Sequence, residues 1–173
     1  PLRAATAKKI DLILLNAEAG LSVFAGDPEA KRLEARLKAI RAHMNIVQEE
    51  HVRALRYLSD SREIFESVQA HYDVAMSDAF MALSMIAIGK AGNISLLEEA
   101  VLNLQRSLQF FASGSNVGIR WKLFYYMAVC ALIIGQGKFS DEDKIKWREL
   151  ASSWLRSSEK EFDQISEGDL AAD

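Results

Sequence analysis

The sequence predicts an all-α protein of about six helices, arranged as stacked antiparallel hairpins in a solenoid or a helical bundle. No segment alternates apolar and polar residues as a half-buried strand does. The chain of 173 residues has two prolines, Pro1 and Pro28, and neither proline nor glycine interrupts residues 29–88. Such long uninterrupted segments with apolar residues every three or four positions are typical of helices.

An apolar segment that occurs twice supports the stacked arrangement. Residues 80–92 return 46 positions later as residues 126–138. The matching pairs include Met81 with Met127, Ala82 with Ala128 and Gly89 with Gly135. Each copy ends at a glycine, and a polar stretch that opens a second amphipathic segment follows it. Units of this kind bury their apolar face against the next unit in an array.

The first two helices, expected over 2–25 and 28–58, should form a long antiparallel hairpin within residues 1–58. Asp27 is a good N-cap, and Pro28 suits the first helical position. In the first helix the apolar face consists of Ile10, Leu14, Ala17, Leu21 and Phe24. In the second, a seam with steps of four and three predicts packing of the coiled-coil type. The seam residues are Leu33, Leu37, Ile40, Met44, Val47, His51, Ala54 and Leu58.

Two similar helix pairs should follow, within residues 61–112 and 119–165. Capping residues at 59–63 predict a bend or a new helix start, and Gly89 and Gly92 should end the helix over 61–90. Asn93 or Ser95 then caps a helix to about residue 112, and the glycines of 113–118 predict a flexible linker.

The last pair comprises helices over 119–135 and 141–165. Ser140 is the expected cap of the last helix, and its acidic first turn complements the positive helix end. Its apolar face consists of Trp147, Leu150, Ala151, Trp154, Leu155, Phe162 and Ile165. Residues 166–173 should be a frayed tail. We expect residues 1–173 to form a single domain, large enough to bury a core without disulfides or metals.

Composition and charge exclude several classes of function. The net charge is −3 and half of the residues are apolar, so neither nucleic acid nor an anionic membrane is an implied partner. The longest apolar run, residues 123–134, is shorter than the roughly 20 residues of a membrane span. Cys130 is the only cysteine, which favours a reducing compartment such as the cytoplasm.

Residues 64–165 resemble tetratricopeptide repeats, and residues 10–58 resemble them more loosely. The second helix of each later pair carries an alanine, a bulky residue four positions on and a small residue seven positions on. These triplets are Ala100, Leu104 and Ser107, and then Ala151, Leu155 and Ser158. The resemblance implies a protein-interaction scaffold whose concave face is lined by the helices over 61–90 and 119–135.

The sequence gives little sign of catalysis or of metal binding. None of the three histidines (His43, His51 and His71) has an acidic residue or another histidine three or four positions away, so no helical metal pair forms. Cys130 lies in the most apolar segment and predicts a core thiol rather than a reactive one. We therefore expect no catalytic residue, no metal and no cofactor.

The leading hypothesis is a non-enzymatic adaptor that binds a peptide or a partner protein in a helical groove, or that dimerises through residues 1–58. Polar contacts would come from Asp73, Ser77 and Asp78 on one helix and from Arg120, Trp121 and Tyr125 on another. Trp, Tyr and Arg dominate interface energetics. The competing interpretation is that Trp121 and Tyr125 simply pack against a neighbouring helix.

An alternative function is a helical sensor or enzyme with a small-molecule pocket between the helices over 61–90, 119–135 and 141–165. Methionine-rich walls adapt to irregular ligands. The residues that would line this pocket are Met81, Met85, Phe124 and Met127.

Overall fold

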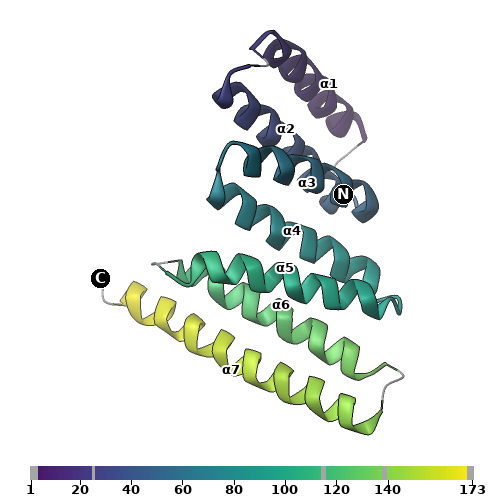
Figure 1. The fold of residues 1–173 in the computed structure, drawn as a ribbon, viewed down its shortest axis with the longest axis vertical. Helices are drawn as coiled ribbons and strands as arrows, with labels where there is room; N and C mark the ends of the chain where they lie inside the picture. Colours follow the sequence, from purple (N-terminus) through teal and green to yellow (C-terminus); the bar gives the residue numbers. More distant parts are fainter. Residues whose placement is uncertain (1–3, 25, 114–115, 138–139, 171–173) are drawn as a thin grey trace. The chain divides into compact units, whose positions relative to one another are not determined.

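The computed structural model of the chain describes residues 4–24, 26–113, 116–137 and 140–170. Most of the described residues are helical, and no strand occurs among them. They form seven α-helices and one 3-10 turn: α1 Ala4–Leu21, η1 Ser22–Phe24, α2 Pro28–Val47, α3 His51–Ser67, α4 His71–Gly89, α5 Ile94–Phe111, α6 Val117–Gly135 and α7 Asp141–Leu170 (Figure 1). The all-α prediction is confirmed, with seven helices in place of about six.

Parts of some predicted segments lie outside the described residues: the beginning of the first helix before residue 4, residue 25, residues 114–115 of the linker, and residues 171–173 of the tail. The backbone of α7 continues to Leu170, beyond the end expected near residue 165.

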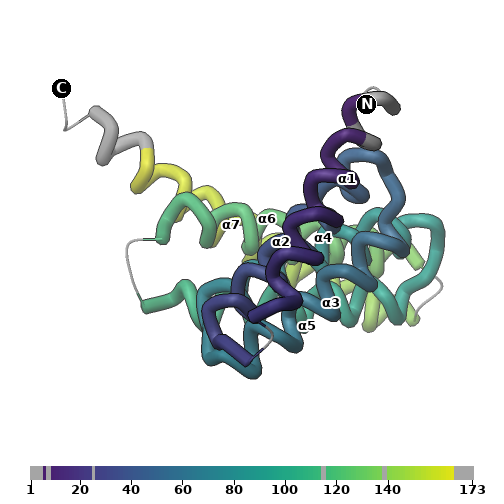
Figure 2. Tube along the Cα trace, turned by 90° about the horizontal axis from the view of Figure 1, so that it is seen from above, coloured from purple at the N-terminus to yellow at the C-terminus, as the bar shows by residue number. Residues whose placement is uncertain are grey.

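The chain divides into two compact units, unit 1 (Pro1–Ser84) and unit 2 (Met85–Asp173). The division falls within α4. Helices that are neighbours in the chain pack together: α1 against α2 and α2 against α3 in unit 1, and α5 against α6 and α6 against α7 in unit 2. Figure 2 shows α1 alongside α2. This packing is compatible with a helical repeat, while the single domain expected over 1–173 stays a prediction.

The single helix expected over 28–58 is wrong, because the chain turns between α2 and α3. Glu49 takes a left-handed conformation with φ 62°. The N–H of Glu50 donates to the carbonyl of Asn45 (2.8 Å), and the N–H of Glu49 to that of Ile46 (3.0 Å). These two bonds form a Schellman ending, which usually has glycine at the left-handed position. A glutamate there gives the sequence no stop signal.

The helix start or bend expected at 59–63 is also wrong, because α3 runs through these residues to Ser67. Ser61 is buried, and its Oγ donates to the carbonyl of Leu58 within the helix (3.0 Å). The chain turns later, where Gln69 has φ 56° and the N–H of Ala70 donates to the carbonyl of Phe65. This is a second Schellman ending without glycine.

The buried face of α2 differs from the predicted seam. Leu33, Ile40 and Val47 are 46%, 47% and 58% exposed. The buried residues are instead alanines, and Ala35 forms a cluster with Phe65 and Ala70. Small side chains allow α2 to pack closely on its neighbour, so the larger residues on its other side remain at the surface.

In unit 2 the buried residues come from the end of α4 and from α5, α6 and α7. Ala100, Leu104 and Ser107, the first triplet of the repeat resemblance, are fully buried. The second triplet differs, since Ala151 and Ser158 are buried while Leu155 is 40% exposed. Trp147 and Trp154, which the sequence placed in the core, are half-buried.

Replacing Gly89 with alanine should destabilise the protein by about 1–3 kcal/mol through overpacking. A Cβ at this position would lie 2.8 Å from Cγ of Leu97 and 2.9 Å from its Cδ2. Leu97 is fully buried and therefore cannot swing into solvent. Gly118→Ala is the control, because no atom lies within 4 Å of its Cβ position. That variant should gain about 0.5 kcal/mol. Urea unfolding measures both, and an unchanged midpoint for Gly89→Ala would contradict the predicted clash.

Two of the described helices, His71–Gly89 and Val117–Gly135, are long and apolar enough to cross a membrane. This is weak evidence for a span, because helices in the core of a water-soluble protein pass the same test. The expectation of no membrane span stays a prediction.

Candidate partner-binding cleft

Unit 1 contains an apolar cleft between α2, α3 and α4, which we call the unit 1 cleft. Its volume is about 290 Å³. Its lining residues are Arg36, Ala39, Ile40, His43, Leu58, Phe65, Asp73, Met76, Ser77 and Phe80. Two of the six predicted site residues, Asp73 and Ser77, are among them. The α2 and α3 side chains of the wall were not predicted, because the sequence placed Ile40 and Leu58 on a buried seam.

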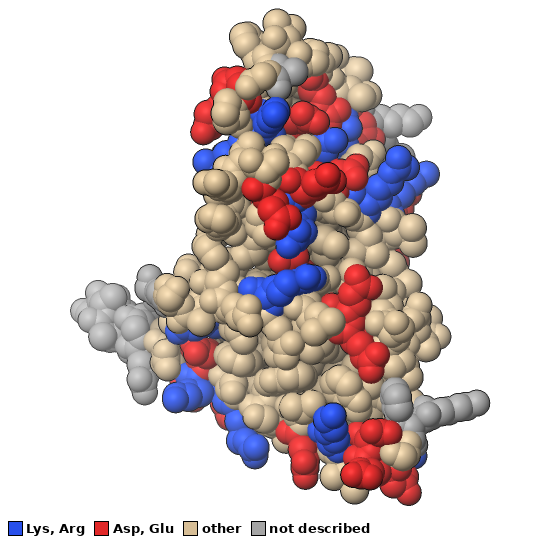
Figure 3. Space-filling view, viewed as in Figure 1, with Lys and Arg blue, Asp and Glu red and all other residues tan. Residues whose placement is uncertain are grey.

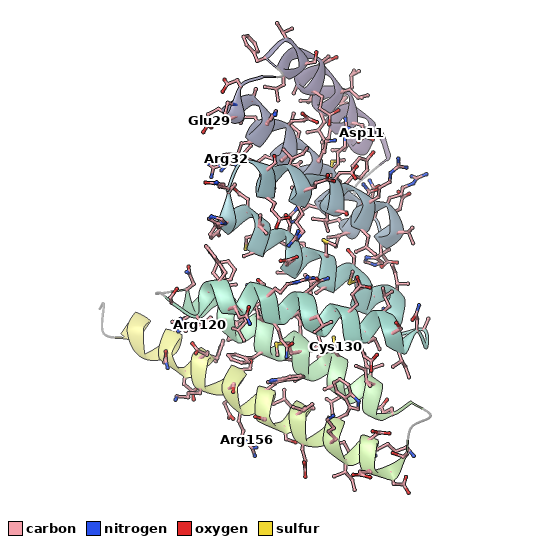
Figure 4. All side chains as sticks on the ribbon, in the orientation of Figure 1. Asp11, Glu29, Arg32, Arg120, Cys130 and Arg156 are labelled. Carbon is pink, nitrogen blue, oxygen red and sulfur yellow. The ribbon has the colours of Figure 1, made fainter. Side chains whose placement is uncertain are left out.

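Ion pairs at the edge of the cleft hold Asp73. Oδ2 of Asp73 lies 3.2 Å from Nη2 of Arg32 and 3.8 Å from Nη2 of Arg36. Figure 4 labels Arg32 near the start of α2. Asp73 is largely covered, whereas both arginines are more exposed. Two guanidinium groups around one carboxylate leave this edge with a net positive charge.

The cleft contains the residue types of a hydrolase triad but not its hydrogen bonds. Nδ1 of His43 donates to the carbonyl of Ala39 (2.8 Å), and Oγ of Ser77 donates to the carbonyl of Asp73 (2.8 Å). A catalytic triad requires the serine to donate to the histidine and the histidine to donate to the carboxylate. Here both donors are bonded to main-chain oxygens. The ring of His43 instead packs edge-on against Phe80, with 4.0 Å between centroids.

Asp78, the third predicted residue on α4, is buried and forms an ion pair within unit 1. Its Oδ1 accepts from Nε of Arg62 on α3 at 2.8 Å. Because it is buried and already paired with Arg62, this carboxylate has little capacity to contact a partner.

The three predicted residues on α6 belong to unit 2. Nη2 of Arg120 lies 2.8 Å from Oε2 of Glu161, and both side chains are largely covered. Trp121 packs in a T-shape against Phe162, with 5.4 Å between ring centroids. Its carbonyl accepts from Ser158 (2.8 Å). Trp121 thus contacts α7, as the packing interpretation describes.

Tyr125 is the most exposed of the three α6 residues. It is 45% exposed, and its ring stands edge-on to Tyr126 at 5.5 Å. Of this set, Tyr125 has the surface area that an interface contact requires.

The four residues proposed to line a small-molecule pocket differ in their solvent exposure. Met85 and Met127 are buried, and Sδ of Met85 accepts from Nδ2 of Asn103 (3.2 Å). Met81 and Phe124 are half-buried. None of these four residues lines the unit 1 cleft.

Cys130 is buried in unit 2, and burial raises the pKa of its thiol to about 12. A thiol with this pKa is protonated at neutral pH and is a poor nucleophile. Within the described ranges, no three His, Cys, Asp or Glu side chains gather as a metal site would require.

Charged residues of both signs are interspersed on the face of the molecule shown in Figure 3. Mixed charge of this kind does not form the continuous positive surface that nucleic-acid binding uses.

Comparisons with known proteins gave no relative: no family model matches the chain, and neither does any curated protein or solved structure. The class of protein is therefore defined by the fold alone, as an all-α chain of packed neighbouring helices.

Proposed function

We propose that this chain is a tetratricopeptide-like, non-enzymatic interaction module that binds a segment of a partner protein in the unit 1 cleft. The observation that carries the proposal is the combination of an apolar cleft with a positively charged edge. Peptide recognition commonly uses an apolar pocket for an anchor side chain, while polar groups around it fix the orientation.

The cleft defines the chemistry of the bound segment. A volume of about 290 Å³ suits one or two side chains. Ile40 and Phe80 supply apolar walls. The two positive charges of Arg32 and Arg36 outnumber the single negative charge of Asp73. The complementary segment therefore carries an apolar anchor with an aspartate or glutamate beside it. Electrostatic complementarity of this kind adds specificity and accelerates association.

A selection from randomised peptides, displayed on phage and captured by the purified protein, tests the proposal. The enriched peptides should share an apolar anchor next to an acidic residue. Ile40→Asp should weaken their binding about tenfold or more, because it places a charge in the apolar wall. Arg36→Gln should weaken it less and reduce its dependence on salt.

Leu33→Asp is the matched control, because Leu33 is as exposed as Ile40, lies seven residues earlier on α2 and does not line the cleft. Binding should survive this change. Equal losses for Ile40→Asp and Leu33→Asp, or a failure to enrich any peptide, would refute the proposal. Tyr125→Ala in the same assay reports whether α6 contributes to the partner surface.

Self-association through residues 1–58 is a second proposal, favoured by the exposed apolar side chains of α1. Leu12, Ile13 and Leu15 are each more than half exposed, so α1 presents an apolar surface that a second copy of the chain can cover. Native mass spectrometry at several protein concentrations tests it. A dimer should form in the wild type and disappear in Ile13→Glu, and a monomer at all concentrations would exclude it.

We also propose a cytoplasmic location. The single cysteine, buried as a protonated thiol, suits a reducing compartment.

A further inference from the structure

A polar cavity lies between α1, α2 and α3 of unit 1, apart from the unit 1 cleft. Its volume is about 350 Å³. Its lining residues are Asp11, Leu15, Arg41, Met44, Asn45, Gln48, Glu50, Arg53 and Tyr57. None of them lines the unit 1 cleft. Leu15 and Met44 supply apolar surface, and the other residues supply charge and hydrogen-bonding groups.

Arg41 is the residue of this cavity whose hydrogen bonding is incomplete. Its side chain is only 12% exposed, and Nη1 pairs with Oε1 of Glu18 at 2.9 Å. Nη2 is buried and has no hydrogen-bond partner among the described residues. A guanidinium group stays charged at any physiological pH and cannot relieve an unpaired N–H by losing its proton. A buried donor of this kind requires an acceptor from water or from a ligand.

The charges around the cavity determine which acceptor fits. Arg53 pairs with Glu50 at 2.8 Å, and Arg41 pairs with Glu18. Asp11, labelled on α1 in Figure 4, has no ion pair within the described part of the chain. With Glu18 included, these residues carry three carboxylates and two guanidinium groups. A simple anion would satisfy Nη2 but would add to this negative charge, and a simple cation would leave Nη2 unpaired.

We propose that this cavity binds a small zwitterion, of the chemical class of a free α-amino acid with an apolar side chain. The ligand carboxylate accepts from Nη2 of Arg41, in the type of charge-assisted bond that arginine forms best. The ligand ammonium group lies toward Asp11. The apolar side chain packs on Leu15 and Met44. This site is independent of the proposed peptide-binding cleft.

Isothermal titration calorimetry on the full chain tests the site, with L-leucine and L-methionine as probes. Each probe has matched analogues: the N-acetyl amino acid lacks the ammonium group, and the amino-acid amide lacks the carboxylate. We expect the free amino acid to bind and each analogue to bind about tenfold more weakly or worse, because each loses one charged contact.

Three variants assign the contacts. Arg41→Gln should abolish binding, and Asp11→Asn should weaken it about tenfold. Asp11 is exposed, so Asp11→Asn leaves the fold intact. This variant therefore still tests the site even if Arg41→Gln, which breaks the pair with Glu18, destabilises the fold. Arg56→Gln is the control, since Arg56 is an exposed arginine of α3 outside the cavity lining.

The proposal is overturned if neither amino acid binds, which would assign the acceptor for Nη2 to water. It is also overturned if the N-acetyl analogue binds as tightly as the free amino acid, or if Asp11→Asn and Arg56→Gln have equal effects. Phage selection on the unit 1 cleft is unaffected by any of these results, so the two proposals fail separately.

Discussion

Replacing Arg62 with alanine should lower the free energy of unfolding by about 3–5 kcal/mol, because the carboxylate of Asp78 would stay buried without its cation. Nε of Arg62 and Oδ1 of Asp78 are 2.8 Å apart. The Asp78 side chain is only 4% exposed and that of Arg62 24%. Most ion pairs among the described residues involve more exposed groups, whose contribution is typically below about 1 kcal/mol.

The charge of Arg62 in the wild type should be the same across the usual range of buffers. The hydrogen bond to Asp78 raises the pKa of Arg62, although burial opposes the shift. A raised pKa of a cation gives stability that is fully present below the unfolded-state pKa and is lost as the pH rises through the folded-state value. Both values are strongly alkaline, so between about pH 5 and 9 the arginine stays charged in both states.

Urea unfolding followed by far-ultraviolet circular dichroism measures the effect, with two control variants. Glu66→Ala removes the second partner of Arg62. The Glu66 side chain is 65% exposed, so this change should cost below about 1 kcal/mol. Asp78→Asn removes the buried charge while keeping a hydrogen-bond acceptor, and should cost less than Arg62→Ala. If Glu66→Ala proves as damaging as Arg62→Ala, the buried pair is not the source of the stability.

The sequence predicted those helix boundaries that have specific capping or stop residues. Asp27 accepts from the N–H of Glu29, Asn93 from that of Leu96 and Ser140 from that of Asp143, so all three act as the caps expected of them. Gly89 ends α4, also as expected.

The two boundaries that the sequence missed have no such residues. Glu49 and Gln69 take the left-handed conformation that usually requires glycine. The tertiary contacts of unit 1, such as the cluster of Ala35, Phe65 and Ala70, favour these turns over a continuous helix. Local propensity contains no information on contacts of this kind, since they depend on residues distant in sequence.

The candidate site was predictable only on one of its walls. Asp73 and Ser77 were predicted from their helical position alone to supply polar contacts to a partner, and both line the unit 1 cleft. The opposite wall contains Arg36 and Ile40 of α2, and the seven-residue spacing had placed Ile40 on a buried seam. Periodicity identifies an apolar face but not the helix that covers it, and here the alanine face of α2 is the buried one.

Replacing Phe111 with alanine should destabilise unit 2 by about 3–5 kcal/mol, the usual cost of deleting a buried aromatic side chain. Phe111, the last residue of α5, is fully buried. The loss combines the transfer free energy of the ring with the cost of the cavity left behind. The hydrogen bond that Nη1 of Arg120 donates to the carbonyl of Phe111 involves the main chain and survives the substitution.

The neighbouring phenylalanine is the matched control, since Phe110 is 40% exposed and stands edge-on to Phe111 at 5.1 Å. Phe110→Ala deletes the same atoms from a partly solvated position and should cost about 1 kcal/mol or less. All three tryptophans of the chain, Trp121, Trp147 and Trp154, lie in unit 2, so their fluorescence follows the unfolding of that unit in urea. Equal midpoints for the two variants would mean that α5 does not bury Phe111 in preference to Phe110. A large gap between them would establish the orientation of α5 on which the packing of unit 2 depends.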